Sequence, residues 1–167
     1  MLIIFAGLPG TGKTTLATEL ALSMGATYVR IDTIEQAMVR SSLRINSAED
    51  AGYLVGYSVA EDNLKIGRTV IADSVNPIDI TRSAWLKVAK NAERPSVEVE
   101  VICSDLDKHR HRVETRVSDI DGLVVPTWQE VLYREYRAWT RDRIVIDTAD
   151  KSLHQSLDEL MSHILNI

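Results

Sequence analysis

The chain of 167 residues is long enough for one domain with a genuine hydrophobic core. Its 45% hydrophobic and 26% charged content is ordinary for a globular protein, and its net charge of −5 argues against broad, sequence-independent binding of nucleic acid. The single cysteine, Cys103, excludes an internal disulfide and a cysteine-rich metal site. The chain opens without a basic leader and contains no run approaching ~18 apolar residues, so we expect a cytoplasmic protein with no membrane partner.

The first half of the chain alternates between strand and helix patterns. Residues 2–6 form a continuous apolar run, which is typical of a central parallel strand covered on both faces. Apolar residues at four-residue spacing predict a helix over 13–24, which Gly25 is placed to end. A second strand is expected over 27–31. Two helical segments are expected next, over 34–43 and 48–65.

The second half of the chain continues this alternation. A third buried strand over 69–72 ends at Asp73. Asn76 followed by Pro77 starts a helix well, because asparagine caps helices and proline suits their first turn. The remaining predicted elements are strands over 97–103 and 144–146, a last helix over 153–164, and capping boxes at 127–130 and 152–155.

Strands separated by helices predict a doubly wound parallel sheet, on which ligands bind beyond the carboxyl ends of the strands. No repeat or low-complexity linker interrupts the pattern, so we expect a single domain over residues 1–167. One feature fits poorly. Glu98 and Glu100 alternate with valines, which is unusual for an interior strand, and we therefore expect the first half of the fourth strand to project beyond the helices.

The strongest motif directly follows the first strand. Residues 7–14 match the phosphate-binding pattern G-x-x-x-x-G-K-[ST] in full. Its glycines allow a tight turn whose N–H groups form an anion-binding nest, and the helix that follows adds its positive end. Lys13 is expected to reach the β- and γ-phosphates, and the Thr14 hydroxyl is expected to ligate Mg²⁺. The sequence therefore predicts binding of a nucleoside triphosphate, namely ATP with Mg²⁺.

Two aspartates end predicted strands beside this loop. Asp32 ends the second strand, where a carboxylate can orient an acceptor hydroxyl and accept its proton. The alternative role is a helix cap, although Thr33 with Gln36 supplies an equivalent capping box. Asp73 ends the third strand, as expected of an acid that binds Mg²⁺ through water or contacts substrate; its alternative role is that of a turn residue.

The densest positive cluster lies in an arginine-rich segment before residue 119. Arg112 and Arg116 are four residues apart, so on a helix they share a face and repel each other unless an anion lies between them. One interpretation pairs Arg116 with Asp119. The other has both arginines close on the ATP phosphates and stabilise charge during phosphoryl transfer, with residues 119–125 as a mobile lid loop.

Together these features resemble the small bacterial P-loop kinases that include chloramphenicol phosphotransferase, zeta-toxin-like kinases and the 5′-kinase domains of polynucleotide kinases. The resemblance covers essentially the whole chain. It is carried by residues 6–15, the aspartate after the second strand, the strand ending in Asp73 and the arginine-rich helix. It implies an α/β P-loop NTPase fold with a five-stranded parallel sheet in the order 2-3-1-4-5, helices on both faces and a short lid over about 107–126.

The same resemblance implies ATP as the phosphate donor and Mg²⁺ as its cofactor. The implied catalytic residues are Lys13, Asp32 as the base, and the lid arginines Arg112 and Arg116. The metal ligands expected from the motif and from the end of the third strand are Thr14 and Asp73. The resemblance also places the turn over 147–149 near adenine, which adds Thr148 to the nucleotide contacts. The full set of expected nucleotide contacts is Gly7, Leu8, Pro9, Gly10, Thr11, Gly12, Lys13, Thr14, Thr15, Arg112 and Thr148.

The chain departs from this group at one position that concerns the acceptor. Many members carry an arginine a few residues after the second-strand aspartate, where it holds the acceptor. Residues 33–36 offer none, and the next arginine is Arg40. This departure favours a neutral or cationic acceptor over one that bears a phosphate. Tyr53 and Tyr57, on one face of a predicted helix, are candidates for contact with it.

The leading prediction is an ATP-dependent kinase that transfers the γ-phosphate to a hydroxyl of a small molecule. One alternative is a polynucleotide 5′-kinase or a nucleotide or nucleoside kinase, although an acidic chain makes nucleic acid an unlikely partner. Another alternative is a non-kinase ATPase or switch module. Against a GTPase switch, no D-x-x-G follows the third strand and no N-K-x-D motif occurs. The sequence leaves the acceptor's identity and the oligomeric state open.

Overall fold

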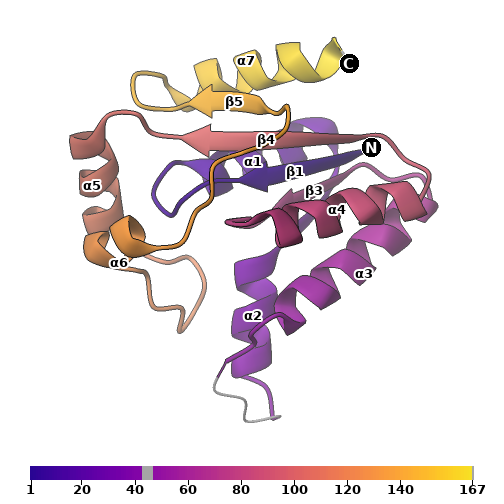
Figure 1. Ribbon diagram of the computed structural model, residues 1–167, viewed down its shortest axis with the longest axis horizontal. Helices are drawn as coiled ribbons and strands as arrows, with labels where there is room; N and C mark the ends of the chain where they lie inside the picture. The colour runs from indigo at the N-terminus through magenta and orange to yellow at the C-terminus, as the bar shows by residue number, and fades with distance from the viewer. Residues whose placement is uncertain (43–46, 167) are drawn as a thin grey trace.

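The computed structural model describes residues 1–42 and 47–166. At its centre is a five-stranded sheet in which all neighbouring strands are parallel, in the order β2-β3-β1-β4-β5 (Figure 1). The strands are β1 Leu2–Ala6, β2 Thr27–Arg30, β3 Val70–Asp73, β4 Ser96–Ile102 and β5 Ile144–Asp147. The predicted strand order and the parallel arrangement are confirmed.

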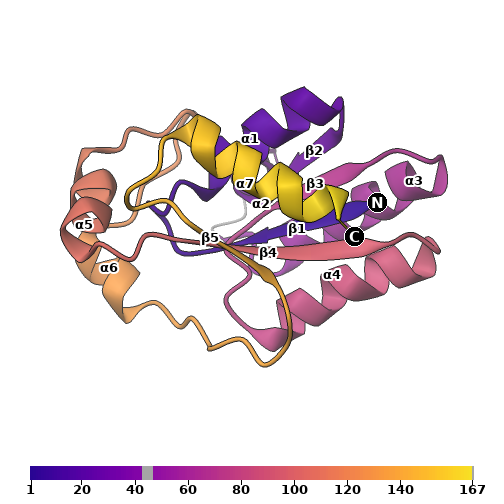
Figure 2. The same cartoon turned by 90° about the horizontal axis from the view of Figure 1, so that it is seen from above.

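Helices cover both faces of the sheet (Figures 1 and 2). They are α1 Lys13–Met24, α2 Ile31–Val39, α3 Ala51–Lys65, α4 Asp79–Asn91, α5 Leu106–Thr115, α6 Trp128–Tyr133 and α7 Leu153–Leu165. α1 and α7 contribute to the core on one face, and α3 and α4 to the core on the other. α5 and α6 lie side by side beyond one end of the sheet. None of the described helices is both long and apolar enough to cross a membrane.

The central strand β1 shows why the sheet needs both helical layers. Ile3 and Phe5 belong to the core shared with α1 and α7, whereas Leu2 and Ile4 belong to the core shared with α3 and α4. All four side chains are fully buried. Because successive side chains of a strand point to opposite faces, an apolar residue at every position requires cover on both. Burial of such side chains contributes roughly 1.5–3 kcal/mol each.

The parallel arrangement brings the functional segments to one edge. β1, β3 and β4 all run toward the end of the sheet where α5 and α6 lie (Figures 1 and 2). The loop after β1, the first turn of α2 and the end of β3 therefore meet at this edge, together with α5. Ligand sites of open α/β sheets lie at such an edge.

The expectation that the first half of β4 projects beyond the helices is wrong. Glu98 and Glu100 are 7% and 6% exposed. The Glu98 carboxylate lies 2.7 Å from Nε of Arg141, and the Glu100 carboxylate lies 2.7 Å from Nε of Arg143. The segment over 134–143, which contains no helix, covers this part of the strand and supplies the paired charges. Burial of the two glutamates is tolerated because each charge has a partner.

The start of α2 differs from the expected one. Strand pairing ends where Arg30 lies opposite Asp73, the last residue of β3, and α2 begins at Ile31. Asp32 therefore lies in the first turn of a helix and not at the end of a strand. It still lies at the carboxyl edge of the sheet, because the helix follows the strand without a connecting loop.

Asn76 does not cap a helix. α4 begins at Asp79 and its N-cap is Ile78. Asn76 instead has a φ of 47°, is fully buried, and donates its side-chain amide to the carbonyl of Phe5 at 2.8 Å. The turn after β3 is therefore tied to β1, which takes the asparagine away from the helix.

The other boundaries follow the predictions more closely. The helix expected over 34–43 ends at Val39, and residue 43 lies outside the described residues. The helix expected over 48–65 begins at Ala51. The capping boxes at Thr127 with Glu130 and at Ser152 with Gln155 are confirmed. The one expected at Thr33 with Gln36 is wrong, because α2 begins at Ile31 and its N-cap is Arg30.

Candidate active site

The phosphate loop connects β1 to α1, as the motif predicts. It needs glycine where neighbouring elements approach it. Gly7 has a φ of 145°, and a Cβ there would collide with the carbonyl oxygen of Val101 in β4. Gly10 has a φ of 85°, and a Cβ there would lie 2.5 Å from Cγ2 of Val113 in α5. These two glycines permit both the turn and the close packing of β4 and α5 against it.

Two carbonyls of the loop are held by side chains that lie far away in the chain. Thr148 donates its hydroxyl to the carbonyl of Thr11 at 2.7 Å, and Nε2 of His109 lies 2.8 Å from the carbonyl of Pro9. In a trans peptide the N–H points away from the C=O. The N–H groups of the two glycines that follow these carbonyls therefore point to the other side of the loop, and both glycines line the cavity described below.

Lys13 and Asp73 form a buried ion pair at the start of α1 and the end of β3. Nζ of Lys13 lies 2.7 Å from one oxygen of Asp73, and the Tyr28 hydroxyl donates to the other oxygen at 2.6 Å. Burial raises the pKa of Asp73, but the charge and hydrogen bond of Lys13, together with the Tyr28 hydroxyl, outweigh burial and hold this pKa below its ordinary value. Asp73 is therefore ionised beside the lysine of the phosphate loop.

Thr14 places a hydroxyl beside the same pair. Its Oγ1 lies 3.4 Å from Nζ of Lys13, and it hydrogen-bonds the Asp73 carboxyl. A hydroxyl and an ionised carboxylate are the hard oxygen ligands that Mg²⁺ prefers. Within residues 1–42 and 47–166, no group of three or more His, Cys, Asp or Glu side chains could hold a metal ion. The residues present therefore fit a Mg²⁺ that takes its other ligands from phosphate and water.

A cavity of about 780 Å³ joins the phosphate loop to the first turn of α2. Its wall contains Lys13, then Asp32 and Glu35 of α2, and Arg112 and Arg116 at the end of α5. Such a volume is typical of sites for cofactor-sized ligands. The structure thus brings together the four residues that the sequence proposes as catalytic.

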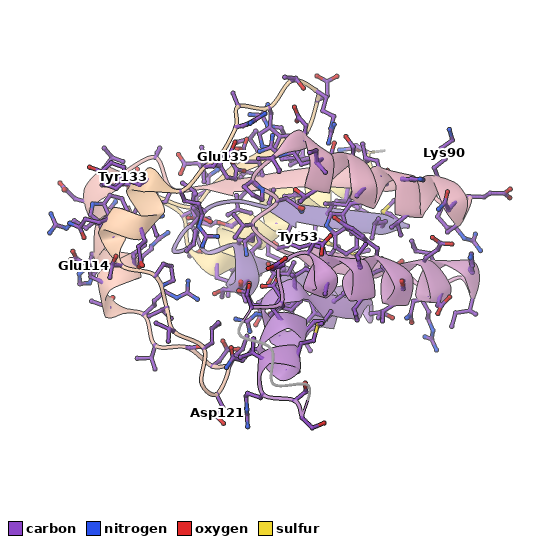
Figure 3. All side chains as sticks on the ribbon, turned by 60° about the horizontal axis from the view of Figure 1, so that its bottom comes forward. Tyr53, Lys90, Glu114, Asp121, Tyr133 and Glu135 are labelled. Atoms are coloured by element: carbon purple, nitrogen blue, oxygen red, sulfur yellow. The ribbon has the colours of Figure 1, made fainter. Side chains whose placement is uncertain are left out.

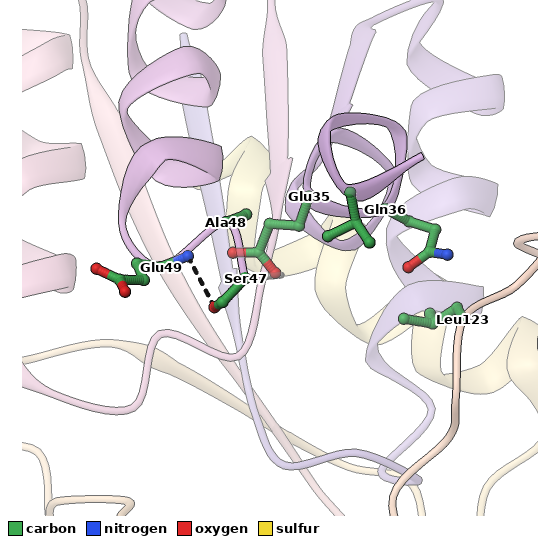
Figure 4. Close-up of a pocket in the computed structure, with 7 residues that line it drawn as sticks. Glu35, Gln36, Ser47, Ala48, Glu49 and Leu123 are labelled. Carbon is green, nitrogen blue, oxygen red and sulfur yellow. Dashed lines mark hydrogen bonds between the residues drawn. The ribbon is translucent and has the colours of Figure 1, made fainter. Parts of the chain in front are cut away.

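A smaller cavity of about 280 Å³ borders α2 as well (Figure 4). Glu35 lines both cavities, and Ala48 and Leu123 help to line the smaller one. Gly52 of α3 leaves room for the glutamate, because a Cβ at Gly52 would collide with Cγ of Glu35. The packing of α2 on α3 therefore holds Glu35 at the boundary between the two spaces.

Glu35 is a candidate functional residue that the sequence analysis missed. Burial and the nearby Asp32 carboxylate raise its pKa to about 7, and the positive charge of Arg134 opposes this shift. The available signal was the three-residue spacing from Asp32, which places both carboxylates on one side of a helix. A carboxyl group with a pKa near neutrality inside a cleft is a common property of functional sites.

Arg112 and Thr148, which are both predicted to contact the nucleotide, are hydrogen-bonded to each other. Nη1 of Arg112 donates to Oγ1 of Thr148 at 2.8 Å, and Nη2 donates to the Thr148 carbonyl at 2.9 Å. Since Thr148 also donates to Thr11, one chain of hydrogen bonds connects α5, the turn after β5 and the phosphate loop. Both residues line the larger cavity.

Asp119 pairs with Arg30, a partner that the sequence analysis did not consider. The two carboxylate oxygens accept hydrogen bonds from the Arg30 guanidinium at 2.6 and 3.0 Å. These hydrogen bonds hold the pKa of Asp119 below its ordinary value, against a smaller opposing effect of burial. Arg30 ends β2 and is 8% exposed, so the pair fastens the loop after α5 to the sheet.

The loop over 116–127, which contains the predicted lid loop, also contacts α2. Gln36 and Arg40 both donate to the carbonyl of Asp121 at 3.4 Å. Asp121 lies at the tip of the loop, beside the end of α2 (Figure 3). Gly122, next in the chain, has a φ of 78°, which glycine adopts readily. The loop therefore extends from α5 across to α2.

Tyr53 and Tyr57 do not line either cavity described above. The Tyr57 ring meets Trp85 edge-on, with centroids 4.6 Å apart and planes at 85°. Tyr53 points toward the space between α3 and α4 (Figure 3), and its hydroxyl lies beside Ser74 and the backbone of Asn76. Both rings belong to the core beneath α3 and α4, where their shared helix face is directed.

Several solved structures share this fold over nearly the whole length of the chain. A protein from Chloroflexus aurantiacus J-10-fl that is regarded as a kinase superposes with a TM-score of 0.74 at 19% identity, covering 99% of this chain and 96% of its own. Kti12 from Chaetomium thermophilum, solved in complex with ADP-AlF3, gives 0.70 at 25% identity, covering 97% and 98%. A gluconokinase from Sinorhizobium meliloti 1021 gives 0.66 at 15% identity, covering 98% and 91%.

Sequence comparison is more restricted in what it finds. No curated protein matches the chain. Residues 2–133 match the family described as AAA domain, AAA_33. The matched part runs from β1 to α6 and so contains the phosphate loop, the ends of β2 and β3, and α5. Since it covers most of the chain, the protein belongs to the AAA domain family AAA_33 and has the fold of a P-loop NTPase.

Proposed function

We propose that the protein is an ATP-dependent phosphotransferase that transfers the γ-phosphate to a hydroxyl group of a small molecule. The observation that carries this proposal is the shared cavity, with Lys13 and the phosphate loop on one side and the Asp32 carboxylate on another. Binding a triphosphate requires only the loop. Transfer to an acceptor also requires a group that orients the acceptor oxygen toward the γ-phosphorus, and a carboxylate in the same space meets that requirement.

On the donor side, the N–H groups of the loop and the ammonium of Lys13 bind the phosphates, aided by the positive end of α1. Thr14 and Asp73 would hold Mg²⁺, which neutralises charge on the β- and γ-phosphates when bound. Arg112 and Arg116 line the cavity from α5 and add positive charge, which stabilises the negative charge of the transferring phosphoryl group. ADP is the leaving group.

On the acceptor side, Asp32 accepts the proton of the acceptor hydroxyl as the new O–P bond forms and the bond to ADP breaks. Its place in the first turn of α2 fixes the carboxylate on a rigid element, without a flexible loop. Glu35 lies one turn further along the same helix and faces the same cavity. The acceptor therefore meets two carboxylates.

These two carboxylates support a neutral or cationic acceptor. Arg30, the buried arginine at the end of β2, is already paired with Asp119, so it is not free to hold a phosphate group of the acceptor. An acceptor that carries its own phosphate would be repelled. Turnover of an amino alcohol and of the hydroxy acid with the same carbon skeleton can be compared directly, and faster use of the hydroxy acid would contradict this preference.

The substitution Asp32→Asn tests the proposed reaction. We expect it to change ATP affinity by less than about threefold and to lower phosphoryl transfer by about 10²–10⁴, because asparagine cannot accept the proton. ADP release over a panel of hydroxyl compounds measures transfer, and calorimetry measures ATP binding. Lys13→Ala is the comparison variant and should lose both. Unchanged turnover in Asp32→Asn would remove this residue from catalysis.

The likeness to Kti12 favours a second candidate function. At 25% identity its structure contains ADP-AlF3, so a non-kinase ATPase module is consistent with the same fold. Such a module would hydrolyse ATP at a rate that no hydroxyl compound increases. A kinase would release ADP faster when the correct acceptor is present, so the panel separates the two functions.

A further inference from the structure

The shape of the phosphate loop depends on a residue outside its motif. His109 of α5 is 5% exposed, and its Nε2 lies 2.8 Å from the carbonyl oxygen of Pro9. A carbonyl can only accept a hydrogen bond, so the proton lies on Nε2. We propose that His109 is a positioning residue for phosphate binding, which holds the Pro9–Gly10 peptide with its N–H directed toward the phosphates.

Peptide geometry links the two sides of this bond. None of the described peptide bonds is cis, and a trans peptide directs its C=O and its N–H in opposite directions. His109 fixes the Pro9 carbonyl on the side of α5. The N–H of Gly10 is therefore directed away from α5, and Gly10 lines the cavity together with Lys13.

Glycine makes this restraint necessary. Gly10 has a φ of 85°, and glycine adopts positive and negative φ values about equally well. Without the hydrogen bond, the peptide between Pro9 and Gly10 can rotate at little cost. Rotation would remove an N–H donor from the anion site and place the partially negative carbonyl oxygen there, which opposes phosphate binding.

The imidazole ring is itself held in place. Trp128 of α6 contacts it edge-on, with ring centroids 5.1 Å apart and planes at 81°. On the loop side, a Cβ at Gly10 would lie 3.2 Å from Cδ2 of His109, so the loop and the ring are in close contact. His109 does not line the cavity. It therefore acts on the ligand only through the loop.

This inference rests on the phosphate binding in the proposed function, but not on transfer, so it is tested by binding. Calorimetry with Mg-ADP compares His109→Gln with His109→Met. The glutamine amide nitrogen occupies roughly the place of Nε2 and can donate to Pro9, whereas methionine has a similar length and no donor. We expect His109→Gln to bind within about twofold of the wild type and His109→Met to bind about tenfold more weakly.

His111→Met is the matched control, because His111 is exposed on the same helix. We expect it to bind Mg-ADP as the wild type does. Unfolding temperatures of all variants are measured without nucleotide, so that a general loss of stability is recognised. Equal affinity of His109→Gln and His109→Met, whether strong or weak, would overturn the proposal, since only the hydrogen bond distinguishes them.

A second comparison applies if His109→Met does not fold. The asparagine amide of His109→Asn ends near the place of Nδ1 and does not reach Pro9. We expect it to bind Mg-ADP more weakly than His109→Gln, and equal affinity would again overturn the proposal. Failure of the wild type to bind Mg-ADP would instead refute the proposed function, and this result is distinct from a loss confined to the His109 variants.

Discussion

At the scale of single residues, charge and burial act together on the acceptor side of the cavity. Glu35 lies one turn from Asp32, and Gly52 provides the space for its side chain. Burial and the neighbouring carboxylate both disfavour the ionised form of Glu35, which raises its pKa from the ordinary 4.5 to about 7. Between about pH 4.5 and 7, Glu35 therefore keeps its proton in the folded protein and loses it in the unfolded chain.

This difference predicts a pH-dependent stability. Because the folded state binds the proton of Glu35 more tightly, the free energy of unfolding falls as pH rises from about 4.5 to 7. Glu35→Gln removes this titration. We expect the variant to match the wild type near pH 4 and to exceed it by about 1 kcal/mol at pH 8, allowing for solvent screening of a half-buried group. Urea unfolding across this range measures the difference.

Glu49→Gln is the control for this experiment. Glu49 lines the smaller cavity but is exposed. We expect its substitution to leave the pH dependence of the wild type unchanged. A gain in Glu49→Gln equal to that in Glu35→Gln would assign the effect to the net charge of the protein and not to the buried carboxyl.

At the scale of elements, α5 and the loop after it connect the parts of the site. α5 contacts the phosphate loop through His109 and Val113. The loop over 116–127 then reaches the end of β2 through Asp119 and Arg30. Donor and acceptor sides are therefore linked by one continuous stretch of chain.

Loss of the ion pair between Asp119 and Arg30 should make the loop over 116–127 more mobile. Asp119→Asn leaves the buried guanidinium with a weaker partner, so the loop over 116–127 should detach more often. We expect its amide hydrogen exchange to rise by about tenfold while exchange in β1 and β3 stays unchanged. Hydrogen exchange followed by mass spectrometry resolves the loop from the sheet.

Asp121→Asn provides a matched substitution on the same loop. The Asp121 carboxylate is 84% exposed and pairs with an exposed Arg40 at 3.0 Å, and such surface pairs contribute little. We expect amide hydrogen exchange of the loop over 116–127 in this variant to stay near that of the wild type. If both variants exchange equally fast, the buried partner is not what holds the loop.

At the scale of the whole molecule, one buried arginine fastens a long segment that contains no helix. Arg82 of α4 has no exposed surface, and its guanidinium donates to the carbonyls of Asn76 at 2.9 Å and Arg137 at 2.8 Å. It also lies 4.0 Å from the centroid of the Trp139 ring. The segment over 134–143, which carries the partners of Glu98 and Glu100, is thereby attached to α4.

Loss of this arginine should destabilise the whole fold. Arg82→Met leaves buried carbonyls without donors, and we expect the free energy of unfolding to fall by about 3 kcal/mol. Chemical denaturation measures the loss. Arg137→Met, which removes a side chain that is 67% exposed, should change stability by less than about 0.5 kcal/mol. A similar small change for Arg82→Met would show that the buried hydrogen bonds are dispensable.

Local patterns made much of the fold and the donor side of the site predictable. The apolar run of β1 indicated a strand covered on both faces, and the glycines and Lys13 of the phosphate loop are contiguous in the chain. The resemblance to P-loop kinases supplied the strand order, which no local pattern contains. Predictions failed at Glu98 and at Asn76, whose partners Arg141 and Phe5 are 43 and 71 residues away.

The sequence by itself determined the phosphate loop, the alternation of strands and helices, and the presence of an aspartate at the carboxyl end of β3 and just after β2, because each depends on neighbouring residues. Only the tertiary structure decided that Glu35 packs against Gly52 at the boundary of the cavity, that Arg30 pairs with Asp119, and that His109 holds the loop. These contacts join residues distant in the chain. Such contacts impose no periodicity on the sequence, so they become visible only when the chain is folded.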